Sequence, residues 1–260
     1  MHFHVLTLFP DLIDCALDYG VVGRARERGV LAIQRTDIRD FATDRHRNVD
    51  DRPYGGGPGM VMLPEVADQA IAAARSAAPS GAPVVHLSPQ GERLDHRVVT
   101  ELAAEPGLIL LCGRYEGIDE RAVDHHVDRE ISLGDYVLSG GELAALVVID
   151  AVARQIPAVL GEPASAEEDS FVGDLLDCPH YTRPRTFEGR EVPSILLSGD
   201  HAAIEHWRLQ QALGRTWLRR PDLLERRGLT PQERALLKAF CTEHGEGEPD
   251  LAGIPERTEV

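Results

Sequence analysis

Strand-like and helix-like segments alternate along the first 160 residues of this 260-residue chain, and this alternation limits the possible folds more than any other feature. Short apolar runs predict strands, and longer amphipathic or alanine-rich runs predict helices. We expect strands at 3–9, 30–35, 84–87, 108–111 and 129–131, and helices at 11–28, 64–78, 95–105, 117–126 and 143–156. The alternation predicts an α/β fold on a mainly parallel sheet.

The composition of the chain changes after residue 160. Residues 161–174 are polar, acidic and small, which is typical of a linker. Helices are predicted beyond it at 201–213, 219–227 and 231–243, with Pro221 and Pro231 at helix starts. We therefore expect an α/β domain (1–160), a flexible interdomain linker (161–174), a small C-terminal helical domain (175–245) and a disordered tail (246–260).

The overall composition is that of a globular protein, with 43% hydrophobic and 27% charged residues. No apolar run reaches the roughly 18–20 residues that span a bilayer, and the apolar N-terminus lacks the basic start of a signal peptide. The four cysteines are widely spaced. These features predict a reduced, cytoplasmic protein with no membrane partner and no zinc site.

Two glycine-bearing loops, at 108–121 and 131–142, indicate where a ligand binds. Glycine lets the backbone approach a ligand closely, and loops at strand ends in α/β sheets commonly bind small molecules. Neither loop contains a phosphate-binding glycine motif. Two further turns, at 51–60 and 88–91, are either part of such a pocket or ordinary structural turns.

The net charge of −16 excludes broad, non-specific binding to nucleic acid but leaves room for a local basic patch. Between residues 201 and 234 there are seven arginines, which suit phosphate recognition; a solvated helical face is the alternative. They are Arg208, Arg215, Arg219, Arg220, Arg226, Arg227 and Arg234.

Three other segments offer reactive or binding groups. Arg154 lies within an apolar helix, where it needs an anionic partner unless it extends to the surface. The carboxylates at 167–169 repel one another, which suits a proton acceptor, although a solvated acidic linker is the common alternative. Residues 177–184 combine His, Tyr and Arg, which can stack on a base and hold a phosphate.

Taken in order along the chain, these motifs resemble the bacterial tRNA (guanine-N1)-methyltransferases of the SPOUT class. The likeness runs from about residue 3 to residue 240 and rests on Asp50–Met60, Leu87–Gly91, Cys112–Arg121, Gly134–Glu142, Leu176–Pro184 and Trp207–Arg220. It implies a SPOUT-type parallel sheet with a deep trefoil knot and a homodimer whose active sites combine both subunits. It also implies methyl transfer from S-adenosylmethionine to N1 of the guanosine directly 3′ of the tRNA anticodon (guanosine-37).

The resemblance assigns roles to particular residues. It implies that Asp169 accepts the N1 proton, that Arg154 stabilises the charge on O6, and that Glu116 holds the guanine or assists the cofactor. The implied cofactor-binding residues are His86, Leu87, Ser88, Pro89, Gln90, Gly91, Gly113, Tyr115, Leu133, Gly134, Tyr136, Val137, Leu138, Gly140 and Gly141. The implied tRNA contacts are Ser170, His180, Arg183, Arg215, Arg219 and Arg220.

Two features qualify the resemblance. Ala144 stands where such proteins often have proline, which affects local rigidity more than chemistry. The family also implies a need for Mg²⁺, although no residue of the sequence indicates a magnesium site. Two alternative functions remain. One is a non-catalytic RNA-binding protein on the same scaffold, and the other is a SPOUT enzyme that methylates another RNA position or a ribose 2′-hydroxyl.

Overall fold

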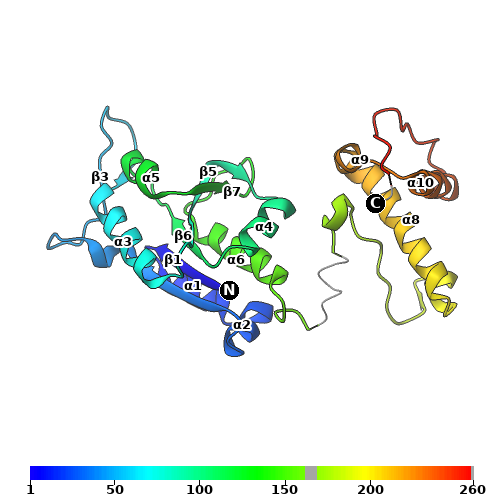
Figure 1. Ribbon diagram of the computed structural model, residues 1–260, viewed down its shortest axis with the longest axis horizontal. Helices are drawn as coiled ribbons and strands as arrows, with labels where there is room; N and C mark the ends of the chain where they lie inside the picture. The colour runs from blue at the N-terminus through cyan, green and yellow to red at the C-terminus, as the bar shows by residue number, and fades with distance from the viewer. Residues whose placement is uncertain (162–168, 259–260) are drawn as a thin grey trace. The chain divides into compact units, whose positions relative to one another are not determined.

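The computed structural model describes residues 1–161 and 169–258. The chain divides into two compact units, Met1–Pro163 and Ala164–Val260, whose described elements are drawn in Figure 1. Each unit has a hydrophobic core of its own.

The first unit is built on a five-stranded sheet in which all paired strands are parallel, with the order β2-β1-β6-β5-β7. The strands are β1 (His2–Thr7), β2 (Ala32–Asp37), β5 (Val84–Arg93), β6 (Leu108–Cys112) and β7 (Arg129–Ser132). Parallel sheets are normally buried on both faces, and the central strand β6 is buried along its whole length. The predicted α/β fold on a parallel sheet is confirmed.

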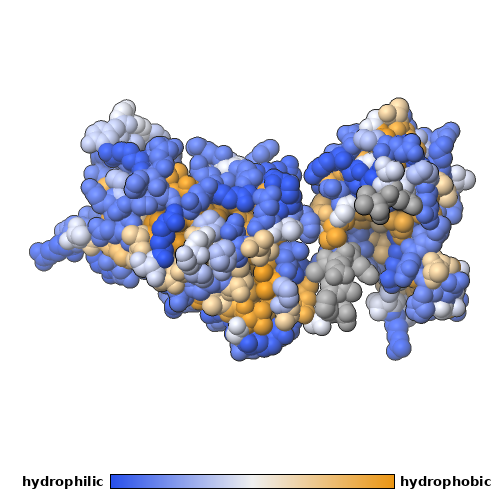
Figure 2. Space-filling view, viewed as in Figure 1, coloured by the Kyte–Doolittle hydropathy of each residue, from blue (hydrophilic) through white to orange (hydrophobic). Residues whose placement is uncertain are grey.

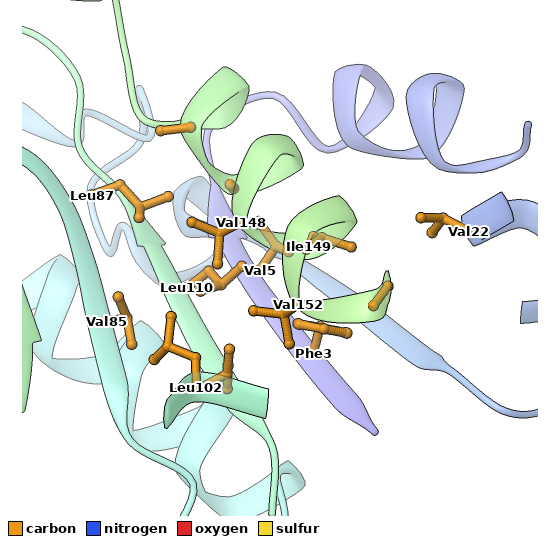
Figure 3. Close-up of a cluster of buried hydrophobic side chains, with 14 of the residues drawn as sticks. Phe3, Val5, Val22, Val85, Leu87, Leu102, Leu110, Val148, Ile149 and Val152 are labelled. Carbon is orange, nitrogen blue, oxygen red and sulfur yellow. The ribbon is translucent and has the colours of Figure 1, made fainter. Parts of the chain in front are cut away.

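Helices cover both faces of this sheet. On one face lie α1 (Pro10–Leu17), α2 (Gly20–Glu27), α4 (His96–Ala103) and α6 (Glu142–Gln155). Figure 3 shows Val148 and Val152 of α6 directed toward Val5 and Leu110 of the sheet. On the other face lie α3 (Pro64–Ala77) and α5 (Glu120–His126).

The predicted helix at 11–28 is two helices, α1 and α2, because the chain turns sharply between them. Gly20 has a φ of +69°, a conformation that favours glycine. A Cβ on Gly23 would lie 2.5 Å from the carbonyl oxygen of Asp18, so only glycine fits there. These two glycines therefore make the turn that divides the segment.

The glycine-rich segment at 51–60 is the loop of a small antiparallel hairpin between β3 (Asp50–Asp51) and β4 (Val61–Met62). Gly55, Gly56, Gly57 and Gly59 all have positive φ. The unusual glycine content is therefore needed for the backbone conformation of the loop.

The second unit contains α8 (His201–Arg219), α9 (Pro221–Arg227) and α10 (Pro231–His244), together with a hairpin of β8 (Thr186–Phe187) and β9 (Arg190–Glu191). Pro221 and Pro231 stand at the first turn of their helices, as predicted. Helix α8 continues past its predicted end at 213, because Gly214 packs against the ring of Phe240, where a Cβ would lie only 2.3 Å from the ring.

The end of the described chain differs from the disordered tail that we predicted. Leu251 and Ile254 pack against the core of the helical unit. The Leu229 amide donates to the Pro255 carbonyl at 2.9 Å, and the Arg257 amide donates to the Leu229 carbonyl at 3.0 Å. The prediction is wrong for this stretch because apolar contacts of Leu251 and Ile254 and backbone hydrogen bonds with Leu229 together hold it.

The predicted linker lies partly outside the described residues, which exclude 162–168; residues 259–260 of the tail are likewise outside them. Residues 169–174 belong to the second unit. The Ser170 hydroxyl accepts a hydrogen bond from the Asp177 amide at 3.0 Å, and Asp174 lies 3.6 Å from Arg226.

Candidate functional site

A cavity of about 330 Å³ opens beside the carboxyl ends of β6 and β7. Its walls come from the middle of β5, at residues 86–90, and from the end of β7 and the segments that follow β6 and β7. Open α/β sheets bind ligands at the carboxyl ends of their strands. Of the predicted cofactor-binding residues, those that line it are His86, Leu87, Ser88, Pro89, Gln90, Gly113, Tyr115, Leu133, Tyr136, Val137, Leu138, Gly140 and Gly141.

The other two predicted cofactor-binding residues, Gly91 and Gly134, are not among the lining residues. A Cβ on Gly91 would lie 2.3 Å from the backbone of Glu130, so this glycine lets β5 approach β7. Gly134 has a φ of +154°, and a Cβ there would lie 2.9 Å from the Tyr136 ring. Both glycines therefore contact residues that line the cavity, although neither lines it.

Two of the cavity loops meet backbone to backbone. The Gly141 amide donates to the Gly113 carbonyl at 2.9 Å, and a Cβ on Gly141 would lie 2.7 Å from Cα of Cys112. A Cβ on Gly140 would lie 2.1 Å from Nε of Arg114. The glycines in these loops therefore permit loop-to-loop contact as well as an open cavity.

A buried ion pair joins the same two loops. Glu142, only 1% exposed, accepts from Arg114 Nε at 2.9 Å and from the Thr7 hydroxyl at 2.8 Å. The Arg114 guanidinium also donates to the Ser139 carbonyl and lies 4.4 Å from the centre of the Phe9 ring. This pair ties the loop after β6 to the start of α6.

Glu116 lies exposed at the cavity, on a loop held by the β3–β4 hairpin. Its amide donates to the Met60 carbonyl at 3.0 Å, and a Cβ on Gly59 would lie 2.3 Å from Oε1 of Glu116. Burial, together with a hydrogen bond to Asp50, raises the pKa of the neighbouring Tyr115 hydroxyl. The hairpin loop is therefore a support for the Glu116 loop.

The three predicted catalytic residues do not all belong to the cavity. Arg154 is half-buried in the last turn of α6 and is not a lining residue. Asp169 is half-buried in the second unit, where its carbonyl accepts from the Val172 amide at 3.2 Å. The first unit thus carries Glu116 and Arg154, and the second carries Asp169.

All of the predicted tRNA contacts, including Ser170, lie in the second unit. His180 Nε2 is 2.6 Å from Asp177 Oδ2. Burial alone would raise the pKa of Asp177, but the hydrogen bonds from His180 and the Cys178 amide lower it. Arg183 and Arg219 are exposed and Arg215 is half-buried. Arg220 donates to both carboxylate oxygens of Asp222.

The seven arginines are not one basic patch, because two of them are structural. The Arg227 side chain is 9% exposed and pairs with Glu233 at 2.6 Å. Arg234 donates to the Ile254 carbonyl at 2.5 Å. Among the ion pairs of residues 1–161 and 169–258, none involves Arg208, Arg215 or Arg219.

Sequence reasoning missed several lining residues, notably Glu120 on α5 and Glu130 on β7. Glu120 lies at the end of the glycine-bearing segment 108–121, on the first residue of α5, and a single carboxylate in a short strand or helix carries no signal of its own. Glu130 becomes visible only through the sheet register, which pairs it with His86.

The fold and the cavity define an α/β protein with a parallel sheet and a cavity beside the carboxyl ends of two of its strands. In the part of the chain that the structure describes, no helix is long and apolar enough to cross a membrane.

The family model for "tRNA (Guanine-1)-methyltransferase TrmD" matches residues 1–226, and the chain belongs to this family. It is 58% identical to a tRNA (guanine-N(1)-)-methyltransferase of Serratia marcescens over 253 residues, which cover 97% of this chain and 99% of the relative. It is 59% identical to a protein of the same name from Salmonella newport (strain SL254) over 246 residues, 95% of this chain and 96% of the relative.

Proposed function

We propose that this protein transfers a methyl group from S-adenosylmethionine to N1 of the guanosine directly 3′ of the tRNA anticodon. The observation that carries the proposal is the glycine-walled cavity built from the three loops to which family resemblance assigns the cofactor. Membership of the methyltransferase family and the names of the relatives support the same reaction.

The lining of the cavity suits S-adenosylmethionine in its free backbone and its charge. Gly113, Gly140 and Gly141 line it, so backbone is available along the wall. Three carboxylates, from Glu116, Glu120 and Glu130, also line it and favour a cationic ligand. When bound, S-adenosylmethionine supplies an electrophilic methyl group on a positively charged sulfur.

The protein's own contribution is proton removal, charge stabilisation and alignment. Guanine N1 is protonated at neutral pH, so its proton must leave before methylation is productive. Asp169 accepts that proton in our proposal, and Arg154 stabilises the negative charge that then builds on O6. Glu116, held by the hairpin loop, orients the guanine or the cationic end of the cofactor.

We further propose a homodimer in which Asp169 of one subunit serves the cavity of the other. Large apolar side chains of the first unit support a partner surface, because Phe9, Leu12, Leu143 and Val147 are exposed. Figure 2 shows hydrophobic residues gathered in the region of α6 and α2 on one face of this unit. A second copy of the chain is the occupant that the family implies.

A trefoil knot in the cavity loops belongs to the same proposal. The chain leaves β7 at one edge of the sheet, and α6 then packs on β1 and β6. The bond between Gly141 and Gly113 brings this crossing segment against the loop after β6. Both observations favour threading of one loop by the next.

We place tRNA on the helical unit, at Ser170, His180, Arg183, Arg215, Arg219 and Arg220. We place the protein in the cytoplasm, where tRNA is modified. The cluster of metal-ligating side chains among the described residues does not suit Mg²⁺. The group with metal-ligand spacing among them is Asp177, Cys178 and His180, and Mg²⁺ prefers oxygen ligands. We derive no step through a metal.

One experiment tests the proposed function. Purified protein is incubated with labelled S-adenosylmethionine and unmodified tRNA transcripts that carry G or A directly 3′ of the anticodon. We expect N1-methylguanosine in the G transcript alone. Equal methylation of both transcripts, or a methyl group on ribose, contradicts the proposal. Binding of both ligands without transfer indicates a non-catalytic RNA-binding protein.

A further inference from the structure

His86 and Glu130 form a pair at the inner end of the cavity. They are directly opposite in the register of β5 and β7, so the sheet itself holds them together. His86 is 7% exposed, and its Nδ1 lies 3.1 Å from Oε2 of Glu130. Both residues line the cavity.

The geometry of this pair fixes the hydrogen-bonding character of the imidazole. A carboxylate only accepts, so the Nδ1–H of the neutral ring donates to Glu130 and Nε2 is left as an acceptor. Nε2 lies against Gly113, where a Cβ would be 3.0 Å away. The absence of a side chain at 113 therefore lets this nitrogen reach the cavity wall.

The charged groups around His86 come from two elements. Glu130 on β7 and Glu120 on α5 both favour the imidazolium form. Its other neighbours, Leu111 on β6 and Gly113 directly after that strand, are uncharged. Burial outweighs the two carboxylates and lowers the pKa of His86, so the ring is neutral at and above neutral pH.

We propose that neutral His86, oriented by Glu130, accepts a hydrogen bond from S-adenosylmethionine through Nε2, which makes cofactor affinity fall as His86 is protonated. This inference rests on the proposed function. It adds a positioning residue, Glu130, and a pH dependence that belongs to cofactor binding. A protonated His86 has no acceptor at Nε2 and also repels a ligand with a positive sulfur.

The test is the pH dependence of the dissociation constant for S-adenosylmethionine, measured by calorimetry on the full-length protein between pH 5.5 and 8. We expect a constant affinity at high pH and a loss that approaches tenfold per unit below the pKa of His86. His86→Gln keeps an acceptor without titration, so we expect near-normal affinity and no pH dependence. His86→Leu should lose about 3- to 10-fold at pH 8.

Glu130→Gln provides the readout for positioning. The amide still accepts from Nδ1 but no longer favours the imidazolium, so the pH at which affinity falls should move lower. His126→Asn is the matched control, because His126 pairs with Asp68 away from the cavity lining. Its profile should follow that of the unchanged protein.

NMR titration of His86 in the unchanged protein provides a test that needs no variant to fold. Saturation with S-adenosylmethionine should lower the pKa of His86. The inference is overturned if the cofactor leaves that pKa unchanged, or if His86→Gln keeps the full pH dependence. Methylthioadenosine, which lacks the amino acid, shows which part of the cofactor donates the hydrogen bond to His86. Its affinity has the same pH dependence if the donor is in the nucleoside. Failure of the cofactor to bind at any pH would instead contradict the proposed function.

Discussion

Glu116, Arg154 and Asp169 each reach their positions in a different way. Glu116 follows a glycine loop and is held by the hairpin at 51–60, whereas Arg154 is carried by the last turn of α6. Asp169 belongs to the second unit, beyond residues 162–168. A glycine loop after an apolar strand is visible in the sequence; one carboxylate in an acidic run is not, and only family resemblance singles it out.

Substitution of Asp169 tests its role as the proton acceptor. Asp169→Asn keeps the shape of the side chain but removes the base, so we expect turnover to fall by about 100- to 10,000-fold with little change in affinity for S-adenosylmethionine. Asp174→Asn, a change in the same segment at a residue that lies near Arg226, is the control. Loss of cofactor binding in Asp169→Asn would make this residue part of the pocket scaffold.

His4 makes the stability of the first unit depend on pH. This residue of β1 is 4% exposed, and its Nδ1 is buried with no hydrogen-bond partner among the described residues. Burial lowers the pKa of His4 below its ordinary value of 6.5, so near that pH the unfolded state binds more protons than the folded state. The stability contribution is therefore complete above about pH 6.5 and is lost as the pH falls toward the folded-state pKa.

Urea unfolding at pH 5.5 and pH 7.5 measures this effect. The unchanged protein should lose free energy of unfolding at low pH, by at most about 1.4 kcal/mol per pH unit for this group. His4→Asn should have a shallower pH dependence, while His206→Asn, an exposed position on α8, should match the unchanged protein. Equal slopes in His4→Asn and the unchanged protein would contradict the assignment.

Among the elements, the start of α6 and the loop after β6 depend most on each other. Glu142 is in the first turn of α6, and Arg114 follows β6, yet the two share a buried ion pair. The sequence predicts both loops and the helix. It cannot predict the pair, because nothing local shows that residues 28 positions apart meet.

Removal of Glu142 should therefore loosen two loops at once. Glu142→Ala deprives Arg114 and Thr7 of their acceptor, and we expect a loss of about 1.5–3 kcal/mol in the free energy of unfolding. Weaker binding of S-adenosylmethionine should accompany it. Glu142→Gln, which keeps an acceptor for Thr7, should lose less on both measures. Thermal melting and calorimetry provide the comparison, and equal effects of the two variants would argue against a role for the charge.

Glycine is also where element boundaries were mispredicted. Gly214 weakens a helix in isolation, yet α8 continues through it past the predicted end at 213, because its lack of a side chain accommodates Phe240. At Gly20 and Gly23 the predicted helix was too long, because a tight turn divides the segment that periodicity alone predicts as one helix. A contact with a distant ring or a backbone oxygen decides each case.

At the scale of the whole molecule, charge is unevenly distributed. The chain carries −16 overall, while Arg208, Arg215 and Arg219 of the helical unit form none of the ion pairs seen among the described residues. Sequence counting alone overestimated this patch, since Arg227 and Arg234 look the same in the sequence but are held within the unit. The parallel sheet and the helical unit were predictable from segment patterns, whereas the sequence suggests the knot and the dimer only through family resemblance.

The salt dependence of tRNA binding tests this distribution. Each arginine that neutralises a phosphate adds nearly one to the slope of log affinity against log salt. We expect the double variant Arg215→Ala, Arg219→Ala to bind tRNA more weakly and to reduce the slope by about two. Arg24→Ala, at an exposed position on α2 of the first unit, is the control. An unchanged slope in the double variant would remove these residues from the tRNA surface.

The docked stretch at 251–257 has a consequence for how the protein is made. Every strand of the large sheet comes from the first 132 residues, so all of these strands are synthesised before the helical unit, which begins at Ala164. Glu233, by contrast, meets Arg257 only after 24 more residues have been added. The nascent chain therefore leaves the exit tunnel with one unit able to fold and the other still missing part of its core.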